Sequence, residues 1–136
     1  MTSSSPGTNL IADTMAVVLW LEQRRLPAQA RALFQQASLG QATIYLPGMV
    51  FAEILYLHER GRISASLADA IALTTGQANF REMPLSAKIT ATAARITDIP
   101  ELHDRLIAAT GVSVGMPVIS NDPLMNASRW GDAFWQ

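Results

Sequence analysis

The sequence predicts an α/β fold with a short, mostly parallel central sheet, and three observations support this prediction. Short runs of β-forming residues alternate with longer segments of helical periodicity, which is typical of βαβ units. Alanine and leucine are abundant, which favours helices between the strands. The 136 residues are 49% hydrophobic and 15% charged, enough to bury one core. We therefore expect a single domain over residues 9–136, preceded by a flexible tail over residues 1–8.

The N-terminal half of the chain predicts two strands and three helices. A buried strand over residues 9–13 leads into a helix over residues 14–23. A second helix over residues 27–38 has a proline in its first turn and a glycine shortly after its end. Residues 43–46 (TIYL) favour a strand. The helix over residues 47–60 follows that strand directly.

The C-terminal half predicts three longer helices separated by short elements. Ser64 is expected to cap the helix over residues 65–75, and Ser86 is expected to cap the next one. Gly111 lies inside the helix expected over residues 102–114, where glycine predicts a weak point. The short elements are a strand within residues 80–85, a strand over residues 117–120, a helix that begins at Pro123 and a last strand within residues 130–135.

Composition limits the function classes that remain. The chain has no cysteine, which excludes a disulfide framework and thiolate chemistry, and which fits a cytoplasmic protein. Its formal net charge is −1, so no global positive field attracts nucleic acid. The first eight residues lack the features of a signal peptide, and no apolar stretch reaches transmembrane length. We therefore expect no membrane partner.

Four acids stand where soluble proteins usually place apolar or neutral residues. Asp13 and Asp122 each follow an apolar run, so both fall at the carboxyl ends of predicted strands. Glu53 shares a helix face with apolar residues, and Asp104 is followed three and four residues later by apolar side chains. In parallel sheets, ligands bind beyond the carboxyl ends of the strands. Because desolvated carboxylates need a compensating cation, the four acids predict a divalent-metal site.

Each acid also has a purely structural interpretation. Asp13 and Asp122 would each cap the helix that follows, and Asp104 suits the positive end of a helix dipole. Glu53 would lie at the solvated edge of its helix, and Glu101 reads as a first-turn acid. Four such acids in one small domain favour a shared site over four separate structural roles.

Other catalytic arrangements find less support in the sequence. His58 is expected at the surface, and His103 is expected on a different helix face from Asp104. The glycines form neither a P-loop nor a dinucleotide-binding motif. An aspartate-nucleophile phosphatase usually has a second acid two residues after the first, where Met15 stands here. A receiver domain needs a suitably placed lysine, and Lys88 does not fit that place.

Four segments together resemble the PIN-domain family, and most of all the toxin ribonucleases of VapBC-type toxin–antitoxin pairs. They occur in family order and with family-like spacing. The resemblance implies a three-layer α/β/α fold, an acidic pocket for one or two Mg²⁺ or Mn²⁺ ions, and cleavage of single-stranded or looped RNA. The segments are Ile11–Thr14, Met49–Ile54, His103–Ala109 and Ile119–Asp122.

The same resemblance assigns roles to individual residues. The family's metal-site acids correspond to Asp13, Glu53, Asp104 and Asp122, and its neighbouring hydroxyl corresponds to Thr14. A serine is also present, at position 120, where the family usually has serine or threonine. The resemblance further implies a homodimer and a cognate antitoxin protein, and Trp20 and Trp135 are candidates for such interfaces. RNA contacts are expected from the arginines near the site, namely Arg105, Arg60 and Arg62, with Arg24 and Arg25 as further candidates.

The chain departs from the family pattern in its long N-terminal tail and in its few basic residues. The thin basic complement makes the RNA-binding surface the least specified part of the prediction. A non-catalytic alternative therefore stays open, in which the chain is a PIN-like binding or regulatory module whose acids are intact but idle.

Overall fold

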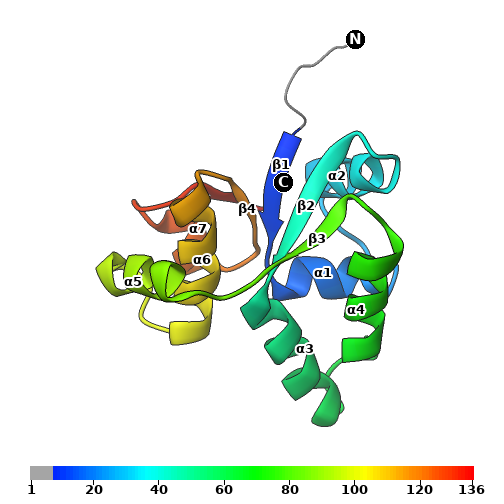
Figure 1. The fold of residues 1–136 in the computed structure, drawn as a ribbon, viewed down its shortest axis with the longest axis horizontal. Coiled ribbons are helices and arrows are strands. Elements are labelled where there is room, and N and C mark those ends of the chain that lie inside the picture. Colours follow the sequence, from blue (N-terminus) through cyan, green and yellow to red (C-terminus); the bar gives the residue numbers. More distant parts are fainter. Residues whose placement is uncertain (1–7) are drawn as a thin grey trace.

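The computed structural model describes residues 8–136, which contain a five-stranded sheet in the order β3-β2-β1-β4-β5 (Figure 1). Every strand pairing in these residues is parallel, so the predicted parallel sheet is confirmed. The predicted tail lies outside the described residues apart from Thr8, which begins the first strand. The strands are β1 (Thr8–Ala12), β2 (Ala42–Pro47), β3 (Phe80–Met83), β4 (Val118–Ile119) and β5 (Ala133–Phe134).

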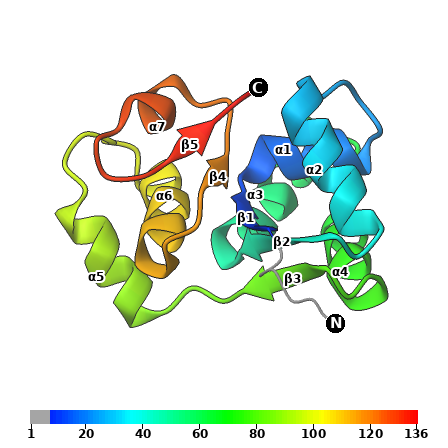
Figure 2. The same ribbon diagram turned by 90° about the horizontal axis from the view of Figure 1, so that it is seen from above.

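The helices cover both faces of the sheet, which confirms the predicted three layers. Figure 2 shows α1 to α4 on one side of the sheet and α5 to α7 on the other. This division follows from the strand order, because the chain moves outward from β1 to β3, then crosses back to β4 and β5. The helices are α1 (Thr14–Leu21), α2 (Ala28–Ser38), α3 (Gly48–Glu59), α4 (Leu67–Gly76), α5 (Ala87–Arg95), α6 (Leu102–Val114) and α7 (Pro123–Ala127).

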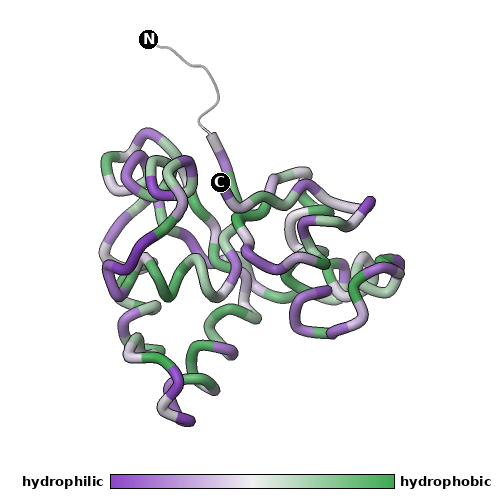
Figure 3. Tube along the Cα trace, turned by 180° about the vertical axis from the view of Figure 1, so that it is seen from behind, coloured by the Kyte–Doolittle hydropathy of each residue, from purple (hydrophilic) through white to green (hydrophobic). Residues whose placement is uncertain are grey.

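The core is built around the central strands β1, β2 and β4. Hydrophobic residues run along the strands and helices, while hydrophilic ones gather in the peripheral loops (Figure 3). Ile11 pairs with Val118 and Ala12 pairs with Ile119, and all four side chains are buried. Burial on both faces explains why these strands read as continuous apolar runs in the sequence.

The two tryptophans named as interface candidates are partly buried against this core. The Trp20 ring stacks on Phe34 and Phe80, with ring centroids 5.2 and 6.4 Å apart. Trp135 also packs against the core. Their contribution is therefore to packing, in line with the usual fate of a large aromatic side chain.

Gly111 is a close contact rather than a weak point of α6. A Cβ atom at this position would lie 2.6 Å from Val118 Cγ2 and 2.8 Å from the Met116 carbonyl oxygen. Because Gly111 has no side chain, α6 can lie directly against β4. Glycine has a low helix propensity, and this close packing offsets its cost to the helix.

The predicted helix starts are confirmed for α5 and wrong for α4. Ser86 caps α5 through its hydroxyl, which accepts a hydrogen bond from the Ile89 amide. The cap of α4 is Ser66, not Ser64, because Ser66 and Asp69 form a reciprocal capping box. The Ser64 amide instead donates to Glu22. Among the helices of residues 8–136, none has the length and hydrophobicity needed to cross a membrane.

Candidate active site

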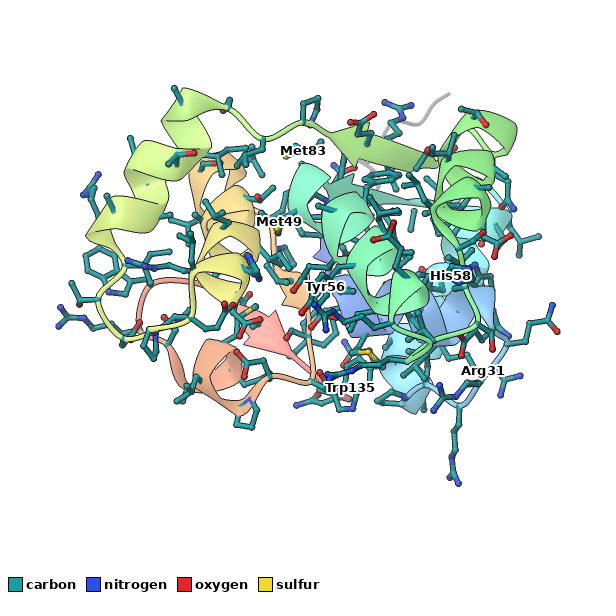
Figure 4. All side chains as sticks on the ribbon, turned by 90° about the horizontal axis from the view of Figure 1, so that it is seen from below. Arg31, Met49, Tyr56, His58, Met83 and Trp135 are labelled. Atoms are coloured by element: carbon teal, nitrogen blue, oxygen red, sulfur yellow. The ribbon has the colours of Figure 1, made fainter. Side chains whose placement is uncertain are left out.

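The two acids that follow strands lie at the same edge of the sheet. Asp13 comes directly after β1, and Asp122 comes three residues after the end of β4. Because β1 and β4 are parallel neighbours, their carboxyl ends meet, and the Asp13 amide donates to the Ile119 carbonyl oxygen at 3.0 Å. Figure 4 views the molecule from this end of the strands. The sheet topology thus brings together two acids that are far apart in sequence.

Helices α3 and α6 bring the other two acids to the same place. Glu53 on α3 and Asp104 on α6 line one cavity with Asp13 and Asp122, and its volume is about 360 Å³. We call it the acid cavity. The remaining residues that line it are Thr14, Met15, Leu57, Ile107, Asn121 and Pro123.

Two of the cavity acids also serve as helix caps, as their structural interpretation predicts. Asp13 Oδ1 accepts a hydrogen bond from the Ala16 amide at 2.9 Å at the start of α1. Asp122 Oδ2 accepts one from the Met125 amide at 3.2 Å at the start of α7. Capping fixes where each carboxylate lies and does not turn it away from the cavity. The structural and the functional interpretations are therefore both consistent with the geometry.

Two hydroxyl groups connect the acids to one another. The Thr14 hydroxyl donates a hydrogen bond to Glu53 Oε1, which ties the start of α1 to α3. Ser120 is fully buried, and its hydroxyl oxygen accepts a hydrogen bond from the Asp122 amide at 3.0 Å. The same hydroxyl is near enough to the Asp13 carboxylate to lower its pKa. These contacts hold the acids in a fixed frame around the cavity.

The surroundings of the acids raise two of their pKa values. Burial raises the pKa of Asp13 to about 6, because only 6% of this residue is exposed. Hydrogen bonds from Ser120 and the Ala16 amide lower it, while the charges of Glu53 and Asp122 raise it further. Burial also raises the pKa of Asp104 to about 6, followed by repulsion from Asp122, Glu101, Glu53 and Asp13. The acids repel one another, so this cavity favours a cation.

The donor atoms suit a hard divalent cation, since all are oxygens and most are carboxylates. As the side chains lie, however, no three histidine, aspartate or glutamate side chains within residues 8–136 are arranged to hold one metal ion. The chemistry of the acid cavity therefore fits Mg²⁺ or Mn²⁺, whereas a coordination shell would require the carboxylates to rotate toward one another.

The arginines expected to contact RNA lie outside the acid cavity. Among residues 8–136, no arginine lines it. Arg105, beside Asp104, is partly buried, and its Nε has no hydrogen-bond partner within the described chain. Arg60 lies over the ring of Tyr56, with 4.4 Å from Cζ to the ring centroid. Arg62 is exposed in the turn after α3.

Arg24 and Arg25 lie farther away, beyond the other end of α1. They line a separate cavity together with Arg31, Trp20 and residues of α4. These two arginines are therefore poor candidates for contacts with a substrate in the acid cavity.

His103 lies closer to the acids than its helix position predicts. Its Nδ1 atom is 3.7 Å from Glu53 Oε2 and 3.5 Å from Glu101 Oε2. It also lines a second cavity, next to the acid cavity, together with Tyr56 and Met49. One signal for this second cavity is present in the sequence: Met49 and Tyr56 are four residues before and three residues after Glu53, on the same helix face. The position of His103 depends on how α6 packs on α3.

The fold agrees with that of known proteins. The family model of the PIN domain matches residues 10–127. The chain is similar to VapBC2 from Rickettsia felis, solved bound to a DNA fragment from their promoter, with 17% identity over 95% of this chain and 100% of that chain and a TM-score of 0.68. It is also similar to DNA-bound VapBC from Salmonella typhimurium, with 12% identity over 93% and 97% of the two chains and a TM-score of 0.66.

A toxin–antitoxin complex from Klebsiella pneumoniae is similar too, with 18% identity over 92% of this chain and 95% of that chain and a TM-score of 0.63. No curated protein matches the chain. At such identities the likeness to the solved structures establishes the fold alone.

Proposed function

Because the chain belongs to the PIN domain family, we propose that it is a metal-dependent endoribonuclease that hydrolyses phosphodiester bonds in RNA. The observation that carries the proposal is the convergence of four carboxylates, from α1, α3, α6 and α7 or their caps, on one cavity. Clustered carboxylates with raised pKa values are typical of catalytic sites. Members of the family are generally nucleases, in agreement with this chemistry.

In the proposed reaction, a water molecule attacks phosphorus in line with the leaving oxygen. Asp13, Asp104 and Asp122 would hold Mg²⁺ or Mn²⁺, directly or through water. When bound, a divalent cation stabilises negative charge on the phosphate and acidifies water. Glu53 would orient the attacking water or bind a second ion, and the Thr14 hydroxyl fixes the orientation of Glu53 through their hydrogen bond.

A direct test is the cleavage of mixed cellular RNA by the purified protein with Mn²⁺ or Mg²⁺. The wild type is expected to cleave, and Asp13→Asn is expected to lose cleavage while it keeps the fold, since asparagine also caps helices well. Circular dichroism and a thermal melt check the fold of the variant. Equal activity of the two proteins would refute a role for Asp13.

A second candidate function is the idle binding module. It is favoured by one observation, namely that within residues 8–136 no three acidic or histidine side chains are arranged to hold one ion. The same assay separates the two functions. Wild-type protein that remains inactive on RNA with either metal, while calorimetry shows no metal binding, would establish the module and exclude the nuclease.

We further propose a toxin role, with a cognate antitoxin protein as partner and a homodimer as the active assembly. The solved structures that resemble this chain include VapBC toxin–antitoxin complexes, which supports the antitoxin. Several large apolar side chains are at least half exposed, among them Leu39, Leu102 and Leu124. Light scattering tests the dimer, and co-expression with the product of a neighbouring small gene tests the antitoxin.

A further inference from the structure

A second cavity adjoins the acid cavity, and the two share Glu53 and Leu57 as common lining residues. Its volume is about 490 Å³, within the range of roughly 300–1,000 Å³ that is usual for small-molecule sites. We call it the aromatic cavity. Its other lining residues are Met49, Ala52, Tyr56 and His103.

The aromatic cavity has the side chains of a stacking site. Tyr56 is 51% exposed, so its ring is accessible. The Arg60 guanidinium lies over that ring, although Arg60 does not itself line the cavity. His103 contributes a second, half-exposed ring from α6. Figure 4 shows Met49 and Tyr56 on α3 at the end of the sheet where the acids lie.

We propose that the aromatic cavity holds an unstacked nucleobase of the RNA whose scissile phosphate lies in the acid cavity. This inference rests on the proposed function. In single-stranded RNA a base follows each phosphate, so a carboxylate cavity next to an aromatic one matches the chemistry of one nucleotide. Proteins that read single-stranded RNA stack its bases on tyrosine and histidine rings and on arginine planes. Tyr56 and His103 provide the two rings of the cavity, and Arg60 lies over the Tyr56 ring.

Charge also favours a nucleobase in this cavity. The acid cavity repels the phosphodiester backbone unless a cation is bound, and no arginine of residues 8–136 lines it. Arg60, stacked on Tyr56, places a cation next to a residue that lines the aromatic cavity. Glu53 and the His103 nitrogens offer polar partners for the edge of a base where the two cavities meet.

A base site of this kind would give a physical reason for the unpaired RNA that the family resemblance implies. A base in a duplex stays stacked and paired, and it must leave the helix to enter a pocket. The aromatic cavity would thus select single-stranded or looped substrates and would fix the phosphate relative to Glu53. Tyr56 is a binding residue in this proposal and takes no part in the chemical step.

The experiment compares cleavage by wild type, Tyr56→Ala and Tyr56→Phe with Mn²⁺. The substrates are a random-sequence single-stranded RNA of 12 nucleotides, the oligomer cut most often from that pool, and that oligomer with the base removed on either side of the cut. Loss of one stacked base raises KM roughly 5- to 150-fold. We expect that rise for Tyr56→Ala, with kcat changed less than about three-fold, while Tyr56→Phe keeps the wild-type KM.

The abasic oligomer completes a double-mutant cycle. Wild type should lose affinity for one of the two abasic oligomers by the same factor, and Tyr56→Ala should not distinguish that oligomer from the intact one. Leu55→Ala is the matched control, because Leu55 is exposed on the same helix and does not line the aromatic cavity. Ala52→Phe, which fills the cavity with an attached ring, should raise KM as Tyr56→Ala does.

The outcomes separate this inference from the nuclease itself. If wild type cleaves RNA and Tyr56→Ala keeps its KM on every oligomer, the nucleobase site is refuted while the nuclease stands. That result would also be expected if the aromatic cavity receives a side chain of a protein partner. If wild type cleaves none of the RNAs, both proposals are refuted.

Discussion

Two pairs of acids in this molecule have opposite surroundings. Glu22 and Asp98 each accept two hydrogen bonds from a distant loop, and these hydrogen bonds lower their pKa values. Glu22 Oε2 accepts from the Ser64 and Ala65 amides at 2.7 and 2.9 Å. Asp13 and Asp104 instead have raised pKa values, because they are buried beside other acids.

The fold favours the ionised forms of Glu22 and Asp98, whereas it disfavours the ionised forms of Asp13 and Asp104. Glu22 ties the loop before α4 to the end of α1, and Asp98 ties the segment after α7 to the loop before α6. The ionised carboxylates of Glu22 and Asp98 stabilise the folded state, because their pKa values are lowered there. Asp13 and Asp104 are ionised at a cost, which other parts of the fold must offset. A group of acids kept at such a cost is a strong indication of a site for a cation.

The largest expected difference between the two pairs is in activity. Asp104→Asn and Asp122→Asn should each lower RNA cleavage by about 100-fold or more, because each removes a carboxylate that would hold the metal. Glu22→Gln, a substitution of the same kind outside the acid cavity, should leave cleavage within about two-fold of wild type. Initial rates of cleavage of a labelled RNA measure the activity of all three variants. An equal loss in all three variants would show that the substitutions act through stability.

The next effect is on stabilisation by metal. A ligand that binds only the folded state stabilises it by about 2.7 kcal/mol at 100 times its Kd. Mn²⁺ should therefore raise the Tm of wild type and of Glu22→Gln alike. Asp13→Asn should melt at or above the wild-type temperature without metal, since it removes a buried charge, and it should show little response to Mn²⁺. A wild-type Tm that does not move at millimolar Mn²⁺ would contradict the metal site.

The two pairs should also respond to pH with opposite sign. Asp13 and Asp104 bind protons more tightly in the folded state, so without metal the free energy of unfolding should fall as pH rises from about 4 to about 6. One unit of pKa corresponds to about 1.4 kcal/mol for each group. Glu22 has a lowered pKa, so its contribution is present above its ordinary value of 4.5 and is lost below it.

Urea unfolding between pH 4 and 7 in a chelating buffer checks this prediction. Stability should be greatest near the lower end of the range, where Asp13 and Asp104 are protonated in the folded state. In the double variant Asp13→Asn, Asp104→Asn, the fall in stability between about pH 4 and about pH 6 should disappear. A fall that persists unchanged would place its origin in other groups.

The smallest expected effect comes from removing the hydrogen bonds that Glu22 accepts from the Ser64 and Ala65 amides. Glu22→Ala leaves the Ser64 and Ala65 amides without their acceptor and should lower the free energy of unfolding by about 1 kcal/mol. Glu59→Ala, on an exposed surface, is the control and should change it much less. Urea unfolding at pH 7 measures both variants. A similar loss in the two would show that the Glu22 contacts contribute no more than an exposed side chain does.

Much of the fold could be predicted because the chain carries strong local signals. The buried runs of β1 and β4 are apolar throughout, and the turns and helix starts contain proline, glycine and serine in suitable places. What failed were predictions that depend on neighbours distant in sequence. Gly111 reads as a weak point until the contact with Val118 is known, and Ser64 reads as a cap until Glu22 is seen to bind its amide.

The sequence by itself identified the four acids that line the acid cavity: an acid after each of two central strands and an acid on the apolar face of each of two helices. This was possible because a carboxylate that is costly to bury can be recognised within an apolar sequence pattern. Only the tertiary structure decided that Tyr56 and His103 line a second cavity beside the acids and that Arg60 lies over the Tyr56 ring. Their positions follow from the packing of α6 on α3, and such contacts between distant segments leave no periodic mark in the sequence.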